Sequence, residues 1–524
     1  QRMALDVLLE ILPETRGLIV SLGLPLSFGG GLFNTACLVV DGRIAGFVAK
    51  QNLAGEGIHY EPRWFKPWPN NVRVEATIDG HSYPLGDLMF DVGSIRIGFE
   101  ICEDAWVADR PGSELALHGV DIILNPSASH FAFGKQEVRK RFVLEGSRAF
   151  NVSYVYANLL GNEAGRAIYD GGAIIASAGR LLAIGPRFSY ADFGLTIATI
   201  DIDATRMIRA RTGSFRPELT GNDSQSVAVA FSYPPAAPEA AVVSQAAWEL
   251  GGFVKEEEFG RAVMLALFDY LRKSHSGGFV VSLSGGADSS AVALLCALLV
   301  KQGISELGVD AFRAKLPAMR SLSEAQHENE FVQLMLTTVY QATRNSGDVT
   351  RNAAKTLATA ISARHLEFDV DALYQGYVEM ISNAIGRPLS WESDDLALQN
   401  IQARVRSPSV WLLANLRGAL LLSTSNRSEA AVGYATMDGD TSGGLCPIAG
   451  IDKAFLRHWL RWMEEHGLAG IGPIKSLSVV NDQQPTAELR PPTAHQTDEA
   501  DLMPYHVLDA IERLAIRDKL VPLE

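Results

Sequence analysis

The sequence predicts an α/β protein with two domains, a layered sandwich of helices and sheets followed by a doubly wound parallel sheet. In the first half, short β-rich runs alternate with helical stretches, which is typical of layered α/β domains. In the second half, apolar runs alternate with helices from Gly278 onward, as a parallel sheet requires. Residues 232–238 are proline-rich and suit a linker. We therefore expect domains at residues 1–215 and 256–524, joined by a linker at 216–255.

The composition narrows the classes of function. The chain has 524 residues, of which 47% are hydrophobic and 20% charged, as in a soluble globular protein. The net charge of −14 argues against a nucleic-acid groove and requires local basic residues around any anionic ligand. No uninterrupted apolar stretch reaches about 18 residues, so we expect no membrane partner. The cysteines are scattered without a disulfide pattern, which indicates a reducing cytoplasm: Cys37, Cys102, Cys296 and Cys446.

The elements of the first half follow from its apolar runs. Residues 3–12 are apolar at helical spacing and predict a helix, and residues 17–25 predict a buried strand. Further strands are expected at residues 33–40, 43–50, 95–102, 119–125, 152–158 and 172–177.

Two side chains in this half have the properties of a nucleophile and its activating cation. Cys102 ends one predicted strand and Lys50 ends a neighbouring one. The thiolate is the reactive form of cysteine, and a nearby ammonium group lowers its pKa. Taken alone, Cys102 would also suit a small core residue.

The motifs around this pair resemble the nitrilase (carbon–nitrogen hydrolase) superfamily over residues 15–205. The resemblance implies an αββα sandwich and an amidase with a Glu-Lys-Cys triad. Cys102 would attack the amide carbon, while Lys50 and the amide N–H after the cysteine would stabilise the oxyanion. The matching motifs are Lys50-x-x-Leu53, Tyr60-Glu61-x-Arg63-Trp64-Phe65, Gly98-x-x-Ile101-Cys102-Glu103-Asp104-x-Trp106, Asn125-Pro126-Ser127-Ala128-Ser129 and Tyr169-Asp170-Gly171-Gly172.

The same resemblance implies roles for several further residues. The family's general-base glutamate lies at the end of an early strand, and because nothing here matches it we expect it in a segment before Gln1. Glu61 resembles a second family glutamate, which supports the lysine, and is counted with Cys102 and Lys50 among the candidate catalytic residues. The glutamine-specific branch of the family holds its substrate at the positions of Glu103, Ser129 and Lys135.

The second half is organised around an anion-binding turn. A predicted strand at residues 278–283 runs into Ser284-Gly285-Gly286-Ala287-Asp288-Ser289, and a helix follows. Unpaired N–H groups at a helix N-terminus converge on a phosphate, and the glycines let the backbone approach it. The two serines add hydroxyl donors, and Asp288 can hold Mg²⁺. The alternative is an ordinary βα turn rich in small residues.

The turn resembles the phosphate loop of the N-type ATP pyrophosphatases, which cleave ATP between its α and β phosphates and adenylate a carboxylate. It is not the GxxxxGK[ST] loop, because no lysine follows the glycines.

The later elements are expected to complete one nucleotide site. Residues 303–330 predict a helical insertion and residues 331–338 the second strand of the sheet. Because ligands lie at the carboxyl ends of parallel strands, Ser284 and Thr337 should share a site. Residues 399–406 supply basic groups ahead of an apolar helix. A helix is also expected at residues 352–361, and residues 420–440 contain a strand that ends in a second polar turn.

Four further motifs resemble the NAD⁺ synthetases, whose domain is a doubly wound, adenine nucleotide α-hydrolase-like fold. Together with the first domain, nearly the whole chain is similar to the glutamine-dependent NAD⁺ synthetase family, including its closing segment at residues 485–499. The motifs are Asn400-x-x-Ala403-Arg404, Thr424-x-x-x-x-Glu429, Gly433-Tyr434-x-Thr436-x-x-Gly439-Asp440 and Pro447-Ile448-x-x-x-x-Lys453.

This resemblance implies the substrates and where they bind. ATP would be held with Mg²⁺ and would adenylate deamido-NAD⁺, which then receives ammonia released from glutamine. Mg²⁺ would be bound by Asp288 and Glu429, and deamido-NAD⁺ by Arg404, Asp440 and Lys453. We also expect a homo-oligomer. The residues implied for ATP are Ser284, Gly285, Gly286, Asp288, Ser289 and Thr424.

Two other functions remain open on the sequence alone. One keeps both half-reactions but amidates a different carboxylate, as other glutamine-dependent ATP-pyrophosphatase amidotransferases do. The other is an ammonia-dependent synthetase, or a binding subunit, whose first domain is an inactive scaffold.

Overall fold

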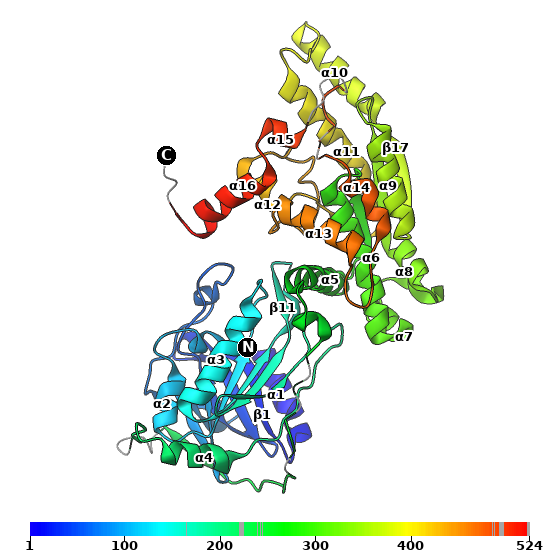
Figure 1. Cartoon of the computed structure of the whole chain (residues 1–524). Helices are drawn as coiled ribbons and strands as arrows, with labels where there is room; N and C mark the ends of the chain where they lie inside the picture. The colour runs from blue at the N-terminus through cyan, green and yellow to red at the C-terminus, as the bar shows by residue number, and fades with distance from the viewer. Residues whose placement is uncertain are drawn as a thin grey trace. The chain divides into compact units, whose positions relative to one another are not determined.

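The computed structural model describes residues 1–163, 165–218, 225–237, 239–241, 243, 245–484, 486, 488–491 and 497–520. The chain forms two compact units, Gln1–Gly251 and Gly252–Glu524 (Figure 1). The boundary falls inside the segment expected as a linker, and parts of the closing segment, including residues 485, 487 and 492–496, lie outside the described residues.

Two sheets form the centre of the first unit. The five-stranded sheet has the order β1-β2-β3-β5-β4, and the seven-stranded sheet has the order β13-β12-β9-β8-β7-β6-β14. A two-stranded sheet adds β10 (Leu160–Glu163) and β11 (Ala167–Asp170). The strands of the larger sheets are β1 (Ile19–Phe28), β2 (Gly31–Val40), β3 (Arg43–Ala49), β4 (Arg73–Ile78), β5 (His81–Gly86), β6 (Met89–Val92), β7 (Ile95–Phe99), β8 (Ile122–Ser127), β9 (Ser153–Asn158), β12 (Ala173–Ser177), β13 (Arg180–Ile184) and β14 (Ser226–Val229).

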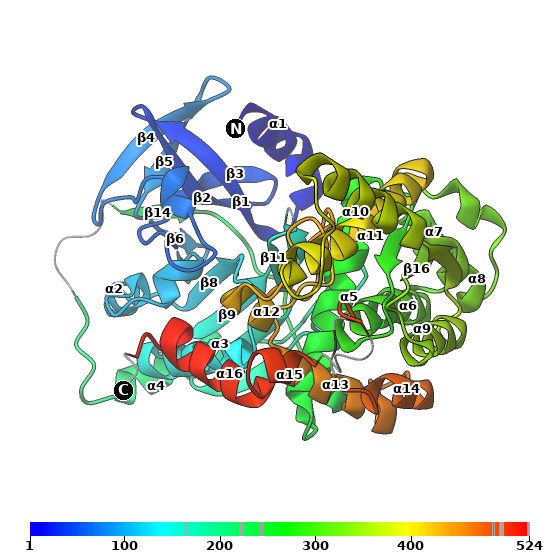
Figure 2. The ribbon, with the colours of Figure 1, turned by 90° about the horizontal axis from the view of Figure 1, so that it is seen from above.

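The alternating side chains of β2 show that the five-stranded sheet has a hydrophobic core on each of its two faces. On β2, Cys37 and Val39 pack with Leu8 of helix α1 (Arg2–Ile11). Their neighbours Ala36 and Leu38 face the other way, into a core shared with β6 and β7. The outer face of the seven-stranded sheet is covered by α3 (Lys135–Phe150), which packs on β9 and β12 (Figure 2). The result is the αββα sandwich that the sequence predicted.

The expected linker is only partly a linker. Residues 226–229 form β14, which pairs in parallel with β6 and closes one edge of the seven-stranded sheet. The strand is four residues long and lies next to a proline-rich stretch, so its sequence gives little signal. Residues 219–224 of the same segment lie outside the described residues.

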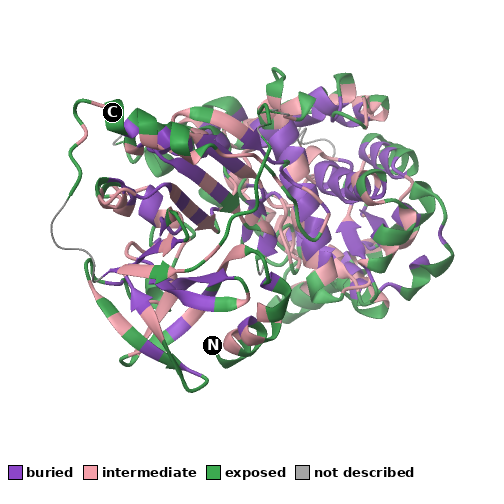
Figure 3. Ribbon diagram, turned by 90° about the horizontal axis from the view of Figure 1, so that it is seen from below, coloured by how far each residue is buried: buried purple, intermediate pink, exposed green. Residues whose placement is uncertain are grey.

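The second unit is built on a parallel sheet with the order β17-β16-β15-β18. Helix α11 covers one face, where Val410 and Ala414 pack on Val280 and Leu421. Buried residues lie on strands β15, β16 and β18 and on the core helices, as the burial colouring of Figure 3 shows. The strands are β15 (Phe279–Ser282), β16 (Leu336–Ala342), β17 (Arg364–Asp369) and β18 (Leu420–Leu422). The helices include α5 (Val254–Ser274), α6 (Ala287–Leu307), α7 (Val309–Ala314), α8 (Glu328–Met335), α9 (Asp348–Ala360), α10 (Asp371–Ile385), α11 (Asp395–Arg417), α12 (Arg427–Val432), α13 (Lys453–Glu465), α14 (Ser478–Asn481), α15 (Asp498–Asp501) and α16 (Tyr505–Glu512).

Three sequence predictions for this unit are wrong in detail. Phe331 belongs to helix α8, and the strand begins only at Leu336. Thr337 is therefore near the amino end of β16, opposite Val280, and not at the carboxyl edge with Ser284. Residues 399–406 lie inside α11 rather than ahead of it. Burial decides the first case, because Phe331, Val332 and Met335 are buried at helical spacing.

Helix α6 is long and apolar enough to cross a membrane by length and composition. However, 72% of its most apolar window is buried inside the protein. It is therefore the core helix of the second unit, with its N-terminus at the phosphate loop.

Candidate active sites

The first site lies where β7 ends. Cys102 is half-buried and begins a short 3-10 helix, Cys102–Ala105, with φ at +51°. A non-glycine residue rarely adopts this left-handed conformation, and such strain concentrates at functional sites. The turn thus holds the thiol at a fixed place at the edge of the sheet.

Lys50 carries the charge expected beside the thiol, and a carboxylate holds it in place. Its Nζ lies 2.5 Å from Glu61 Oε2, and the two side chains are 3% and 14% exposed. Glu61 also accepts hydrogen bonds from Asn34 Nδ2 and the Ala54 amide, both at 2.8 Å. With three donors on one carboxylate, Glu61 is held in place and keeps the ammonium group oriented.

Asp104, which was not among the residues predicted for the site, joins the segment of Cys102 to the segment that follows Lys50. Its Oδ1 accepts from the Asn52 amide at 2.8 Å, and its Oδ2 accepts from the Ile101 amide at 3.0 Å. Burial raises the pKa of Asp104 to about 6, although these hydrogen bonds oppose the shift. Its place in the Cys-Glu-Asp motif was the signal that could have identified it.

A cavity of about 710 Å³ brings the predicted catalytic residues together. Cys102, Lys50 and Glu61 all line it. Within the described part of the first unit, its other carboxylate is Glu163, which accepts a hydrogen bond from Tyr169 at 2.8 Å. The remaining wall is largely apolar and aromatic, and includes Ile58, Tyr60, Trp64, Phe65, Leu159 and Tyr169.

The residues expected to hold glutamine are placed differently from the catalytic candidates. Glu103, Ser129 and Lys135 are not among the residues that line the cavity. Lys135 Nζ lies 3.2 Å from His130 Nδ1, which is 2.8 Å from Nε2 of the cavity residue His59. Two imidazoles thus connect the predicted substrate lysine to the cavity wall, and no spacing pattern in the sequence pairs these histidines.

This environment predicts the pH dependence of glutamine binding. Burial and the charge of Arg139 lower the pKa of Lys135 to about 8. Above that pH the side chain loses the positive charge that would hold the substrate carboxylate, so KM for glutamine should rise by up to about tenfold per pH unit. A Lys135→Arg variant keeps its charge and should show a flatter profile. Glutamate release measured from pH 7 to 10 checks this, and parallel profiles for the two proteins would contradict it.

The second site is the glycine turn after β15. Gly285 has φ at +87°, and a Cβ there would lie 2.2 Å from the Thr350 carbonyl oxygen, so only glycine fits. The Gly286 amide and Ser289 Oγ lie 3.3 Å and 3.0 Å from Ser284 Oγ. Helix α6 begins at Ala287, so its free N–H groups point from this turn.

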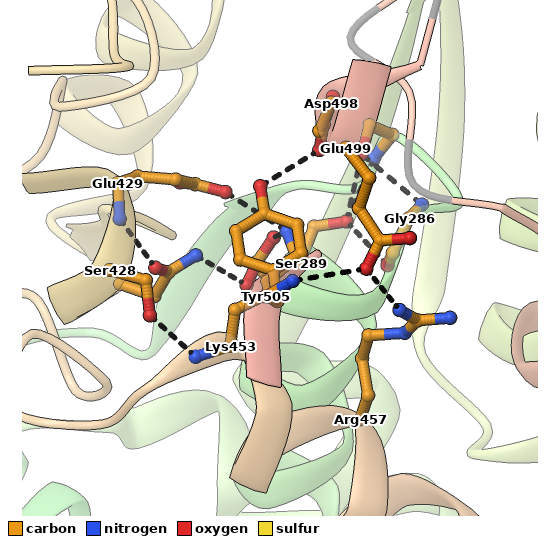
Figure 4. A network of polar contacts seen from close by, with 12 residues as sticks. Gly286, Ser289, Ser428, Glu429, Lys453, Arg457, Asp498, Glu499 and Tyr505 are labelled. Atoms are coloured by element: carbon orange, nitrogen blue, oxygen red, sulfur yellow. Dashed lines mark hydrogen bonds and ion pairs between the residues drawn. The ribbon is translucent and has the colours of Figure 1, made fainter. Parts of the chain in front are cut away.

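Lys453 lies at the centre of a polar network beside the turn (Figure 4). Its Nζ contacts Asp288 Oδ2 and lies 2.9 Å from Glu429 Oε1, and its side chain is only 4% exposed. Although burial lowers it, the pKa of Lys453 is held above its usual range by these carboxylates. Burial and the charge of Asp288 raise the pKa of Glu429 to about 7.

The two carboxylates predicted to bind Mg²⁺ therefore converge. In the described residues no group of three or more Asp, Glu, His or Cys side chains is arranged around a metal. Magnesium in nucleotide sites usually takes only one or two carboxylates and fills its shell with phosphates and water. Asp288 and Glu429 fit a cation that arrives with a polyphosphate.

Two cavities flank the turn. One of about 260 Å³ is lined by Asp288, Thr424, Glu429, Asp440 and Lys453, among others. A smaller one of about 70 Å³ lies toward β16 and α9 and shares part of the turn.

Arg404 is placed differently from the other predicted contacts of the dinucleotide. It is exposed, its Nε donates to the Met437 carbonyl at 3.0 Å, and it does not line the larger cavity. Arg406, two residues further along α11, lines both cavities.

Comparison with known proteins identifies the family. The carbon–nitrogen hydrolase model matches residues 8–210, and the NAD synthase model matches residues 260–522. A glutamine-dependent NAD(+) synthetase of Oryza sativa subsp. indica is 31% identical over 95% of this chain and 72% of its own length. The chain belongs to the glutamine-dependent NAD⁺ synthetases. It is therefore a ligase that combines a glutaminase domain with a synthetase domain, and the functions left open above are not favoured.

Solved structures agree with the fold of this synthetase. The crystal structure of a glutamine-dependent NAD(+) synthetase from Cytophaga hutchinsonii has a TM-score of 0.78 and 42% identity, and the match covers 99% of this chain and 76% of that one. A second, from Acinetobacter baumannii, has a TM-score of 0.62 at 20% identity, covers 98% and 76%, and contains adenosine diphosphate. The predicted α/β class, with its sandwich and its doubly wound sheet, is confirmed.

Proposed function

We propose that the first unit releases ammonia from glutamine through a thioester on Cys102. The thiolate attacks the amide carbon, the carbon–nitrogen bond breaks, and ammonia leaves with a proton. Water then hydrolyses the thioester to glutamate. Lys50, oriented by Glu61, stabilises the charge on the carbonyl oxygen together with the Glu103 amide N–H. The meeting of Cys102, Lys50 and Glu61 on one cavity supports this assignment.

We propose that the second unit uses this ammonia to convert deamido-NAD⁺ to NAD⁺. The nicotinate carboxylate attacks the α-phosphorus of ATP, and the bond to the bridging oxygen of pyrophosphate breaks. Ammonia then attacks the acyl carbon, loses a proton, and displaces AMP. No protein nucleophile takes part, so positioning and charge neutralisation carry the rate.

The observation that carries this assignment is the convergence of Asp288, Glu429 and Lys453 beside the glycine turn. When bound, Mg²⁺ would neutralise charge on the phosphates, held by the two carboxylates. Because Lys453 already contacts both of them, we place it at the metal-bound phosphates as well as near the dinucleotide. Arg404 on α11 and Asp440, which follows α12, are proposed to contact deamido-NAD⁺. The adenosine diphosphate bound by the Acinetobacter baumannii protein supports ATP as a substrate. A cytoplasmic homo-oligomer with no nucleic-acid or membrane partner is part of the same proposal.

Product analysis tests the assignment. Purified protein given Mg-ATP, glutamine and deamido-NAD⁺ is expected to form NAD⁺, AMP, pyrophosphate and glutamate in equal amounts. Nicotinate mononucleotide and aspartate, tried as matched carboxylate acceptors, should support less than about 1% of this rate, since discrimination built on several polar contacts reaches that size. Removal of Mg²⁺ with a chelator should stop AMP formation but not glutaminase chemistry. Faster amidation of another acceptor would overturn the proposal.

A further inference from the structure

Arg406 lies beside the glycine turn and lines both of the cavities that flank it. Five described residues line both cavities that flank the loop: Ser284, Gly286, Ala287, Arg406 and Thr486. Within this shared set, Arg406 is the charged side chain. It therefore lies where the two cavities meet, next to the N-terminus of α6.

The guanidinium group of Arg406 has no protein partner in the described parts of the chain. Its Nε is buried without a hydrogen bond, and no carboxylate forms an ion pair with it there. Hydrogen bonds to the main chain hold Arg406 in place, because its carbonyl oxygen accepts from Gln341 Nε2 and from Ser409 Oγ. Burial lowers the pKa of Arg406, with Asp440 the largest opposing charge. Keeping an unpaired cation in such a place is costly unless an anion joins it.

Three of the neighbouring cations are already engaged, whereas Arg461 lines only the smaller of the two cavities. Lys453 contacts two carboxylates, and Arg457 Nη1 lies 3.4 Å from Glu499 Oε1. Arg404 points to the surface and donates to the Met437 carbonyl. A planar guanidinium, moreover, can donate two parallel N–H groups to one phosphate, which an ammonium group cannot do.

We propose that Arg406 is a catalytic residue that binds the α-phosphate of ATP during adenylation. The proposal rests on the function proposed above. The larger cavity is lined by Asp440 and Lys453, two of the three residues assigned to the carboxylate acceptor. The α-phosphate is the one group bonded to the nucleoside, to the leaving pyrophosphate and, in the transition state, to the attacking oxygen. It must therefore lie at the junction. There Arg406 donates N–H groups to the non-bridging oxygens of phosphorus, where negative charge gathers as the Pα–O bond breaks.

Exchange of labelled pyrophosphate into ATP, dependent on deamido-NAD⁺ and without a nitrogen donor, isolates this step. For Arg406→Ala we expect exchange to slow by about 100-fold or more, the size of effect seen when one transition-state donor is lost. The Kd of ATP, titrated without the acceptor, should change by less than about fivefold. Arg406→Lys should recover part of the rate. Arg351→Ala removes an exposed arginine paired with Glu367, and should behave as wild type.

Two results would overturn the role of Arg406. One is an Arg406→Ala protein whose exchange stays within about threefold of wild type. The other is a weakening of ATP binding as large as the loss of rate, shared by Arg406→Lys, because this would make Arg406 a ground-state binding residue. Glutamate release from glutamine reports whether each variant is folded in its first unit, and thermal unfolding reports on the second. If the proposed function itself were wrong, the wild-type protein would show no pyrophosphate exchange with deamido-NAD⁺. This result is distinct from both outcomes for the Arg406 variants.

Discussion

Replacing Cys102 by alanine is expected to abolish glutamine-dependent NAD⁺ formation while leaving ammonium-dependent formation close to the wild-type rate. Loss of a catalytic nucleophile lowers kcat by roughly 10⁴-fold or more, because the remaining groups cannot replace the covalent step. The thiol lies in the first unit and the phosphate loop in the second. Ammonium salts supply the nitrogen directly, so the synthetase chemistry does not need the thioester.

The measurement compares NAD⁺ formation with glutamine and with ammonium chloride as nitrogen donor. A matched control is Cys37→Ala, which removes a buried thiol from the core behind the five-stranded sheet and does not touch the cavity. That variant should retain both activities, with some loss of stability. Loss of both activities in a folded Cys102→Ala protein would contradict separate active sites.

The first unit shows what local sequence can predict about a site. Cys102 and Lys50 follow the ends of β7 and β3, and Glu61 begins a short 3-10 helix in the loop after β3. Each lies within a recognisable motif, and the fold brings these motifs to one cavity. The contact of His59 with His130 joins residues 71 positions apart in two loops, and no periodicity encodes such a pairing. The lining of the cavity was therefore less predictable than its catalytic centre.

In the second unit, the boundary between a helix and the following strand could not be predicted from the sequence. The apolar run from Phe331 suits a helix or a strand equally well. Packing against the surrounding core decides for a helix up to Met335. That shift of five residues moves Thr337 from the carboxyl edge of the sheet to the amino end. On α11, Arg404 and Arg406 are two positions apart and point in different directions, so a motif alone cannot say which of them reaches the loop.

The phosphate loop itself gives the other large expected effect. An Asp288→Asn variant is expected to lose both glutamine-dependent and ammonium-dependent NAD⁺ formation by about 10³-fold, since it removes the charge that Lys453 contacts and that the proposed Mg²⁺ would need. Asparagine preserves the size of the side chain and can still accept from Asn426 Nδ2, which lies 2.9 Å from Asp288 Oδ1. The change is therefore one of charge more than of shape.

Stability must be separated from catalysis in this variant. Lys453 is buried and would keep only Glu429 as a partner, and breaking a buried ion pair costs about 3–5 kcal/mol. A second substitution, Lys453→Met, removes the cation that Asp288→Asn leaves with a single carboxylate partner. Glu429, whose pKa burial already raises to about 7, can then take up a proton, so the double variant should recover stability without recovering activity. Thermal unfolding and pyrophosphate release from the two single variants and the double variant distinguish these effects. If Asp288→Asn formed pyrophosphate from ATP and deamido-NAD⁺ at the wild-type rate, the turn after β15 would not be where ATP is held.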